Sequence, residues 1–398
     1  MANSERGASD PPFARCRSAF ALRSCARCSS AFAIRYSPFF IRHFLPTRLA
    51  DRNAVSWRSM ARVDVDIVIV GAGFAGAASA YHLAKRGQTS VLLLDKEAQP
   101  GVHSSGRNAA IVREHVDDPA IQPIMTAGAA VLRRGHLATF EPCGVMLLGL
   151  GDQDVRSHFP RAAGTGLWCP QDGTVDVVGL LRSYLANQRV SFNTTVLGWE
   201  NLDNALRVET SEGTILCKLL VNAAGPWAGT LGGLPLTPMN RHLFVTGPVD
   251  WAEPNLPCVW DGNLGLYFRP ESGGLLLSCC DETPASPGDY REEPAVLDQL
   301  ARKLASSQPG LGDLSVRHKW VGQRVFAPDR RFAIGFDPRC DRVFHVAALG
   351  GHGVTASYEV GRLAASLITD HATDSAKTLD PASPFDPARL LPNALLTK

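Results

Sequence analysis

The feature that most constrains the fold is a glycine-rich turn placed directly after a short apolar strand. Residues 64–70 predict a strand, and its last four residues, Ile-Val-Ile-Val, are apolar without interruption, as in a strand buried on both faces. The turn Gly71-Ala-Gly73-Phe-Ala-Gly76 follows at once. Residues 77–86 then predict a helix that ends at Gly87, and residues 90–94 predict a second apolar strand. This order is a βαβ unit of an α/β fold.

Each glycine of this turn has a physical reason to be there. Gly71 permits a tight turn, Gly73 lets a pyrophosphate approach the backbone, and Gly76 lets the helix press on the strand. The free N–H groups and the dipole at the helix N-terminus favour a bound anion. Asp95, at the end of the second strand, is placed to accept hydrogen bonds from ribose hydroxyls. The pattern predicts a dinucleotide site, for NAD or FAD; the alternative is a βαβ unit that binds nothing.

The rest of the chain predicts a Rossmann-like α/β domain into which a second, mainly antiparallel β-sheet domain is inserted. Residues 61–135, 173–235 and 327–373 are assigned to the first domain, and residues 136–172 and 236–326 to the second. The second part is rich in strand patterns, at 144–150, 164–168, 241–246, 265–269, 274–278 and 316–320, with one helix at 294–306. The first part contains a helix at 176–187, a meander over 191–216, strands at 219–222 and 342–347, a glycine loop at 350–353 and a helix at 357–368.

The two ends of the chain differ from its middle. Residues 1–60 are rich in arginine and serine, and predict either a disordered extension or a mitochondrial targeting segment. Without such a segment we expect a cytoplasmic protein. The tail, residues 374–398, is rich in proline and alanine and is expected to be peripheral.

Composition excludes several classes of function. The formal net charge is only +2, which argues against a nucleic-acid-binding protein. No apolar run approaches the ~18 residues of a transmembrane helix. The ten cysteines are scattered, as in a protein with reduced thiols. Cys25 and Cys28 form a CxxC pair, but no second pair lies at the spacing of a zinc site, so no metal site is expected.

Four motifs in this order resemble the D-amino acid oxidase superfamily of flavoproteins, which includes glycine oxidase, sarcosine oxidase and the D-amino acid dehydrogenases. They are the glycine turn at 71–76, Gln-Pro-Gly-Val-His-Ser-Ser-Gly-Arg-Asn-Ala-Ala at 99–110, Val-Asn-Ala-Ala-Gly-Pro-Trp-Ala at 221–228 and Ala-Leu-Gly-Gly-His-Gly-Val at 348–354. The second motif looks most like that of the D-arginine dehydrogenases. The resemblance covers residues 64–370 and implies an FAD-dependent oxidation of an amino acid's C–N bond.

The resemblance also implies which residues hold FAD. The glycine turn and Asp95 would bind the pyrophosphate and the ribose, and Val196 the adenine through its backbone. Residues of the 99–110 loop would line the pyrophosphate and the flavin, the 221–228 motif would lie near the adenosine half, and the last motif would wrap the flavin. Besides the glycine turn, Asp95 and Val196, the residues that these motifs would contribute to the FAD site are Ser104, Ser105, Arg107, Asn108, Ala109, Ala224, Gly225, Gly350, Gly351, His352, Gly353 and Val354.

On the substrate side, the resemblance assigns roles to four side chains. Arg324, in Gly322-Gln-Arg324, would grip the substrate carboxylate, since a guanidinium offers a planar fork for two hydrogen bonds. Tyr267 and Arg241 would line the pocket, and His352 would lie near the flavin; for Arg324 and His352 a purely structural role is the alternative. Members with covalently bound flavin have a cysteine where Gly322 stands, so FAD is expected to be noncovalent.

The expected reaction is transfer of a hydride from the substrate Cα to flavin N5, followed by reoxidation by oxygen or a quinone. D-Arginine dehydrogenases resemble this chain but have polar residues around positions 111–116 and 145, where Ile111, Val116 and Val145 stand here. This difference predicts a substrate less polar than arginine. Oxidation of a 2-hydroxy acid, a noncatalytic FAD-binding subunit and an NAD-dependent enzyme are the alternatives.

Overall fold

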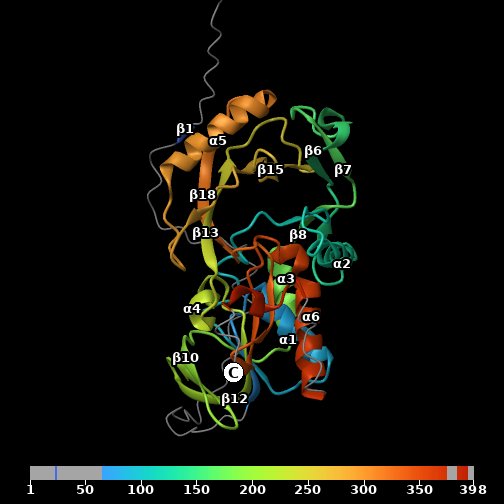
Figure 1. The fold of residues 1–398 in the computed structure, drawn as a ribbon. Helices are drawn as coiled ribbons and strands as arrows, with labels where there is room; N and C mark the ends of the chain where they lie inside the picture. The colour runs from blue at the N-terminus through green and yellow to red at the C-terminus, as the bar shows by residue number, and fades with distance from the viewer. Residues whose placement is uncertain (1–22, 25–64, 374–382, 393–398) are drawn as a thin grey trace, which may run out of the picture.

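A mostly parallel eight-stranded sheet forms the lower half of the molecule in Figure 1, in a computed structural model that describes residues 23–24, 65–373 and 383–392. Its parallel part has the order β9-β3-β2-β12-β20, and antiparallel β19 lies at the edge beside β20. The hairpin β10–β11 is joined to the first half of β12. The strands are β2 (Val65–Val70), β3 (Val91–Leu94), β9 (Val190–Ser191), β10 (Val196–Asn201), β11 (Leu206–Thr210), β12 (Gly213–Asn222), β19 (Ala333–Asp337) and β20 (Cys340–Ala347).

The apolar run of β2 is buried on both of its faces. Ile67 and Ile69 pack into the core beneath the helices, whereas Val68 and Val70 pack into a second core on the side of the β10–β11 hairpin. The helices of the first core are α1 (Phe74–Lys85), α2 (Gln122–Leu132) and α6 (Gly353–Thr373), with α3 (Val177–Leu185) alongside α1. Gly361 of α6 faces Ala78 of α1 so closely that a Cβ there would lie 2.5 Å from the Ala78 carbonyl carbon.

The upper half of the molecule is a nine-stranded, mainly antiparallel sheet (Figure 1). Its order is β1-β18-β13-β16-β15-β14-β6-β7, with β17 beside β13. The strands are β1 (Arg23–Ser24), β6 (Val145–Asp154), β7 (Thr165–Cys169), β13 (Thr237–Thr246), β14 (Cys258–Asp261), β15 (Leu266–Glu271), β16 (Gly274–Ser278), β17 (Thr283–Pro284) and β18 (Ser315–Phe326). Three short strands, β4 (Ile111–Val112), β8 (Gly173–Val175) and β5 (Phe140–Glu141), form a third sheet.

The two faces of the upper sheet have different neighbours. One face packs Phe268 and Leu277 against Leu300 of α5 (Pro294–Ser307). The opposite face carries Leu243 and Tyr267, which pack with Ala109, Ile111 and Trp260. This second face is therefore turned toward the loop that follows the βαβ unit. Short helical turns complete the fold, namely α4 (Ala228–Gly232), η2 (Val155–Ser157), η3 (Gly225–Trp227), η4 (Pro309–Leu311) and η5 (Pro387–Leu390).

Several elements differ from the prediction. The end of the predicted meander and the predicted strand at 219–222 are one continuous strand, β12, because its first half pairs with β11 and its second half with β2 and β20. Helix α6 begins at Gly353, four residues before the predicted start, and β18 continues to Phe326. Helix α2 was not predicted. In the described parts of the chain, no helix is both long and apolar enough to span a bilayer.

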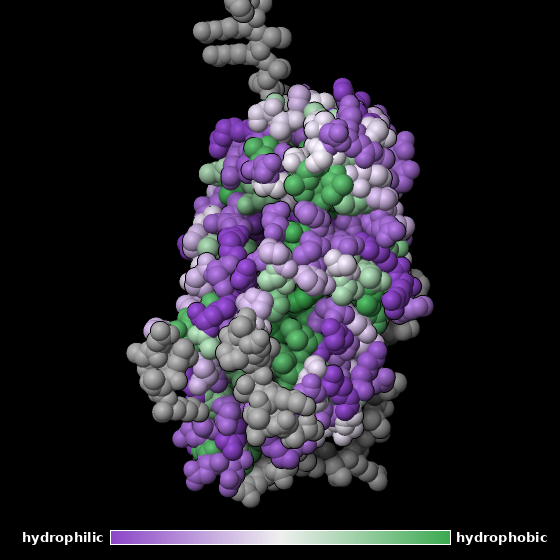
Figure 2. Space-filling view, turned by 45° about the vertical axis from the view of Figure 1, so that its right-hand side comes forward, coloured by the Kyte–Doolittle hydropathy of each residue, from purple (hydrophilic) through white to green (hydrophobic). Residues whose placement is uncertain are grey.

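The structure describes only short segments of the two ends of the chain. Most of residues 1–60, including Cys25 and Cys28, and most of residues 374–398 lie outside the described residues. Of the N-terminal segment, only β1 is described, which pairs in parallel with the start of β18. Figure 2 shows a surface on which hydrophilic residues predominate and hydrophobic residues gather in separate patches, as expected when the apolar strands lie inside.

Candidate active site

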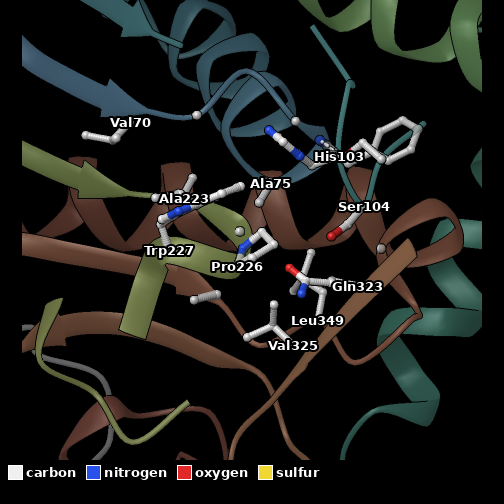
Figure 3. A pocket seen from close by; sticks show the side chains of 18 of the residues that line it. Val70, Ala75, His103, Ser104, Ala223, Pro226, Trp227, Gln323, Val325 and Leu349 are labelled. Atoms are coloured by element: carbon white, nitrogen blue, oxygen red, sulfur yellow. Dashed lines mark hydrogen bonds between the residues drawn. The ribbon is translucent and has the colours of Figure 1, made fainter. Parts of the chain in front are cut away.

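A cavity of about 340 Å³ lies at the carboxyl ends of four parallel strands of the lower sheet (Figure 3). Its wall includes the last residues of β2, β3 and β20 and the residues that follow β12, among them Val70, Leu94, Ala223 and Val346. In open α/β sheets this edge is where ligands bind, since the loops there diverge to either side of the sheet. The walls are mainly apolar side chains and glycine backbone.

The glycine turn forms one end of this wall. Gly71 has a φ of +103°, and its amide donates to the carbonyl of Leu94 over 2.8 Å. Gly73 is the N-cap of α1 and has no side chain with which to cap the helix, and the first turn has no acidic residue. The positive end of the α1 dipole therefore opens on the cavity. Gly76 does not line the cavity; a Cβ there would collide with the carbonyl oxygen of Gly71, so its role is close packing of strand and helix.

Asp95 holds the glycine turn from the neighbouring strand. Its Oδ2 accepts from the amide of Ala72 over 2.7 Å, and its Oδ1 accepts from the amide of Glu97 over 2.9 Å. Burial raises the pKa of Asp95, while these two amides act in the opposite direction. Asp95 and Val196 both line the cavity, and the carbonyl of Asp95 accepts from the amide of Thr194 over 2.9 Å. Each carboxylate oxygen has a further lone pair with which to accept from a ligand.

Hydroxyl and amide side chains of the 99–110 loop face the cavity. Ser104, Ser105 and Asn108 all belong to its lining. Ser105 Oγ accepts from the amide of Phe74, at the start of α1, over 2.9 Å. Ser104 Oγ is buried and has no hydrogen-bond partner in the described part of the chain. A buried hydroxyl without a partner costs free energy, so Ser104 Oγ indicates a ligand group at this point of the cavity.

Arg107 and Ala109, two residues assigned to the cofactor by resemblance, lie behind this wall rather than in it. Arg107 Nε donates to the carbonyl of Val102 over 3.0 Å, and its Nη1 donates to the carbonyl of Val321 over 3.1 Å. The carbonyl of Ala109 accepts from Arg269 Nε over 2.7 Å. Both residues thereby connect the loop to the upper sheet and fix its path along the cavity.

The glycine loop before α6 forms the opposite wall. Gly350 and Gly351 have φ values of +54° and +91°, a conformation that glycine adopts without steric cost. Gly353 and Val354, the first residues of α6, also line the cavity, and the first turn of α6 has no acidic residue. A second helix N-terminus therefore opens on the cavity. His352 does not line it; burial, with the charges of Arg113, Arg330 and Arg241, lowers its pKa to about 3, so the ring is neutral at physiological pH.

A group of side chains without a predicted role lies across the end of the cavity near Val196, Ala224 and Gly225. Trp227 packs edge-on against His103, with ring centroids 4.6 Å apart, and Lys96 Nζ lies 3.5 Å from the centre of the Trp227 ring. His103 Nδ1 lies 2.6 Å from the hydroxyl of Tyr290, and its Nε2 lies 2.8 Å from Glu97 Oε1. His103, Trp227 and Lys96, here called the clasp, join three separate segments of the chain over the cavity. His103 belongs to the 99–110 motif and Trp227 to the 221–228 motif, so these two motifs were the sequence signal that could have indicated both residues.

Arg324 brings the upper sheet to the cavity. It lines the wall, is 8% exposed, and packs against Gly351. Its Nη1 donates to the carbonyl of Arg107 over 3.1 Å, and no carboxylate of the described residues lies within 4.0 Å of its guanidinium. Burial lowers the pKa of Arg324, and the nearby charge of Arg241 acts in the same direction. A buried guanidinium of this kind is suited to bind an anionic ligand.

Tyr267 and Arg241 lie near Arg324 but not in the lining of this cavity. Tyr267 is 3% exposed and stacks on Trp260 with ring centroids 4.7 Å apart. Burial raises its pKa, against the charges of Arg324 and Arg241. Arg241 Nη2 lies 3.0 Å from Glu282 Oε1, and its Nε donates to the carbonyl of Asp281. The upper sheet thus supplies one arginine to the cavity wall and places a second arginine and a phenol near it.

These features fit a flavin dinucleotide. The cavity offers two helix N-termini for negative charge, an unpartnered hydroxyl at Ser104, and glycine backbone that a ligand can approach closely. Within the described residues, no group of three or more histidine, cysteine, aspartate or glutamate side chains is arranged to hold a metal ion.

Comparison with known proteins gives consistent matches. A family profile described as FAD dependent oxidoreductase matches residues 66–367. Glycine oxidase from Bacillus licheniformis is 23% identical over 353 residues, covering 76% of this chain and 92% of the relative. Mitochondrial sarcosine dehydrogenase from Homo sapiens is 26% identical over 303 residues, covering 63% of this chain but 31% of the relative, so the chain spans about a third of that protein. The crystal structure of glycine oxidase from Geobacillus kaustophilus superimposes with a TM-score of 0.69 at 22% identity, covering 83% of this chain and 100% of that chain.

Proposed function

Because this chain belongs to the DAO family of FAD dependent oxidoreductases, we propose that it oxidises the C–N bond of an amino acid, either a D-amino acid or an N-substituted one. The substrate loses a hydride from Cα and a proton from its nitrogen, which forms a C=N bond. Water then converts this imine to an oxo acid and releases ammonia or an amine. The two electrons pass finally to oxygen or a quinone.

The observation that carries this proposal is Arg324, a buried guanidinium without a carboxylate partner among the described residues, in the wall of the same cavity as both helix N-termini. Arg324 would bind the substrate carboxylate through two parallel hydrogen bonds and so fix the position of Cα. Tyr267 would close the pocket beside it, and Arg241 would add positive charge from the next strand. The neutral ring of His352 would add no charge there.

The cofactor would lie along the cavity. Gly71, Gly73 and the start of α1 would hold the pyrophosphate, with Ser104, Ser105 and Asn108 alongside. Asp95 would accept from the ribose, and Val196 and Gly225 would border the adenine end. Gly350, Gly351, Gly353 and Val354 would border the flavin, where the N-terminus of α6 favours negative charge on the ring. When bound, FAD supplies the acceptor for the hydride.

The test is an anaerobic screen of the purified protein with D-amino acids and N-methyl amino acids, followed by the loss of flavin absorbance. We expect a subset to reduce the flavin with release of ammonia or methylamine. Reduction by 2-hydroxy acids alone would replace the proposed substrate class. Bound FAD that no amino acid reduces, or a protein that takes up no FAD, would contradict the proposal.

A further inference from the structure

Arg113 is a second arginine on the substrate side that has no carboxylate partner among the described residues. It follows β4, and its guanidinium carbon lies 4.2 Å over the ring of Trp260. Its Nη1 donates to the carbonyl of His115 over 2.9 Å. Within the described chain, no carboxylate oxygen lies within 4.0 Å of its guanidinium, whereas neighbouring Arg133 has Glu114 and Asp172 at 2.7 Å. Arg113 is thus a half-buried cation without an ion pair among the described residues, although the charges of Asp117 and Asp172 favour its charged form.

The two arginines, which have no carboxylate partner among the described residues, each lie near one member of an aromatic pair. Trp260 and Tyr267 face each other across β14 and β15, and their rings stack at 4.7 Å with an interplanar angle of 9°. Arg113 contacts the Trp260 end. The charge of Arg324 is close enough to Tyr267 to oppose the rise in its pKa that burial causes. On this side of the upper sheet, Arg113 from the segment after β4 therefore lies over Trp260, and Arg324 of β18 lies near Tyr267.

Burying cations without anions is costly, since desolvation is then not offset by an ion pair. One substrate carboxylate at Arg324 would neutralise one end of this arrangement and leave the other end charged. A substrate with two acidic groups would neutralise both arginines, with its carbon chain beside the stacked pair of rings.

We propose, resting on the amino acid oxidation proposed above, that the substrate carries a second acidic group and that Arg113 binds it. The substrate class is an amino acid with an acidic side chain or with a carboxyalkyl group on nitrogen. This differs from the less polar substrate expected from Ile111, Val116 and Val145. Val116 lies in the core of the lower half, so it does not bear on the substrate, and Arg113 stands between it and Ile111.

The first experiment compares acids with their neutral amides in anaerobic reduction of the holoenzyme. The pairs are D-glutamate with D-glutamine, D-aspartate with D-asparagine, and N-carboxymethylglycine with its monoamide. In at least one pair we expect the acid to have a kcat/KM for reduction at least ~10-fold above that of its amide, as one ion pair warrants. R113M should lower that ratio to about 1. Equal rates within every pair, or an unchanged ratio in R113M, would overturn the proposal.

A control is available in the turns beside the upper sheet. Arg161 also lies over a tryptophan, with its guanidinium carbon 5.0 Å from the centre of the Trp251 ring. Trp251 packs against the core on the α5 side of the sheet, away from the cavity. R161M therefore removes an arginine of the same geometry elsewhere, and should leave the acid-to-amide ratio at the wild-type value. FAD content and thermal midpoint of R113M, compared with R161M, show whether its fold is intact.

A binding measurement separates this inference from the proposed reaction. Glutarate and its monoamide, glutaramate, cannot be oxidised at a C–N bond in this way, and their binding is measured by the shift in the flavin absorbance. We expect glutarate to bind at least ~10-fold more tightly than glutaramate, and R113M to remove the difference. Such binding without reduction by any amino acid would keep the second acid site and overturn the proposed reaction. If amino acids reduce the flavin but acids are preferred neither in catalysis nor in binding, the proposed reaction is kept and the second acid site is overturned.

Discussion

Arg241 and Arg324 leave the upper sheet on the same face, from adjacent antiparallel strands. Arg241 of β13 stands opposite Gly322 of β18, and Arg324 stands opposite Met239, so the two arginines are diagonal neighbours. Arg241 is paired with Glu282, whereas Arg324 has no carboxylate among the described residues. Their different partners predict different roles, with Arg324 free to bind an anion and Arg241 held as fixed positive charge.

Replacement of Arg324 is expected to affect substrate binding and not cofactor binding. R324A should raise KM for carboxylate substrates about 100-fold, because a buried ion pair with two hydrogen bonds is lost. R324K should recover only part of this, since an ammonium lacks the planar fork. Steady-state kinetics measure both, with R317K on the exposed side of β18 as the control. A loss of FAD at unchanged KM would refute the role of Arg324.

Adjacent serines in the cavity wall are expected to behave differently. Ser104 Oγ has no partner among the described residues, so S104A should leave the stability of the apoprotein unchanged or higher, but raise the Kd for FAD several-fold. Ser105 Oγ accepts from the amide of Phe74, so S105A should lower the free energy of unfolding of the apoprotein by about 1 kcal/mol. Denaturant unfolding of the apoprotein and FAD titration check the pair. Destabilised S104A apoprotein with normal FAD affinity would contradict this assignment.

The clasp of His103, Trp227 and Lys96 is expected to slow the release of the cofactor. Trp227 contributes an edge-on contact with His103 and a cation–π contact with Lys96, and W227A removes both. We expect the dissociation rate of FAD to rise about 10-fold, which corresponds to about 1.4 kcal/mol. The increase in flavin fluorescence after dilution of the holoprotein measures this rate. W168A, in the upper sheet, is the control and should leave the rate unchanged.

Buried His82 is expected to make stability depend on pH. Burial, and then the charge of Lys85, lowers its pKa from 6.5 to about 4. Between these values the unfolded chain binds more protons than the folded protein. The contribution of His82 to the free energy of unfolding is therefore largest above pH 6.5, falls as the pH decreases toward 4, and is constant below that pH.

H82M should therefore reduce the loss of stability between pH 6.5 and 4 by on the order of 3 kcal/mol. Urea unfolding at a series of pH values measures this slope. His136 is exposed, so H136M is the control and should retain the wild-type slope. An H82M slope equal to that of the wild type would show that His82 does not titrate in this range.

The first βαβ unit illustrates what a sequence determines alone. The burial of β2 on both faces, the turn at Gly71 and the start of α1 all depend on residues that are neighbours in the chain. Local backbone conformation and apolar spacing specify such elements directly. The position of Asp95 is also determined by the sequence alone, because a residue at the end of β3 must lie beside the turn after β2 when the two strands are parallel neighbours.

The partners of the site residues were decided only by the tertiary structure. Arg113 meets Trp260, and Trp227 meets His103, across more than a hundred residues of chain. Likewise, the sequence placed Arg324 on the substrate side by resemblance, but only the fold shows that Arg241 has a carboxylate partner and that Arg324 has none among the described residues. Burial and ion pairing depend on which distant segments pack together, and no local pattern of residues encodes that choice.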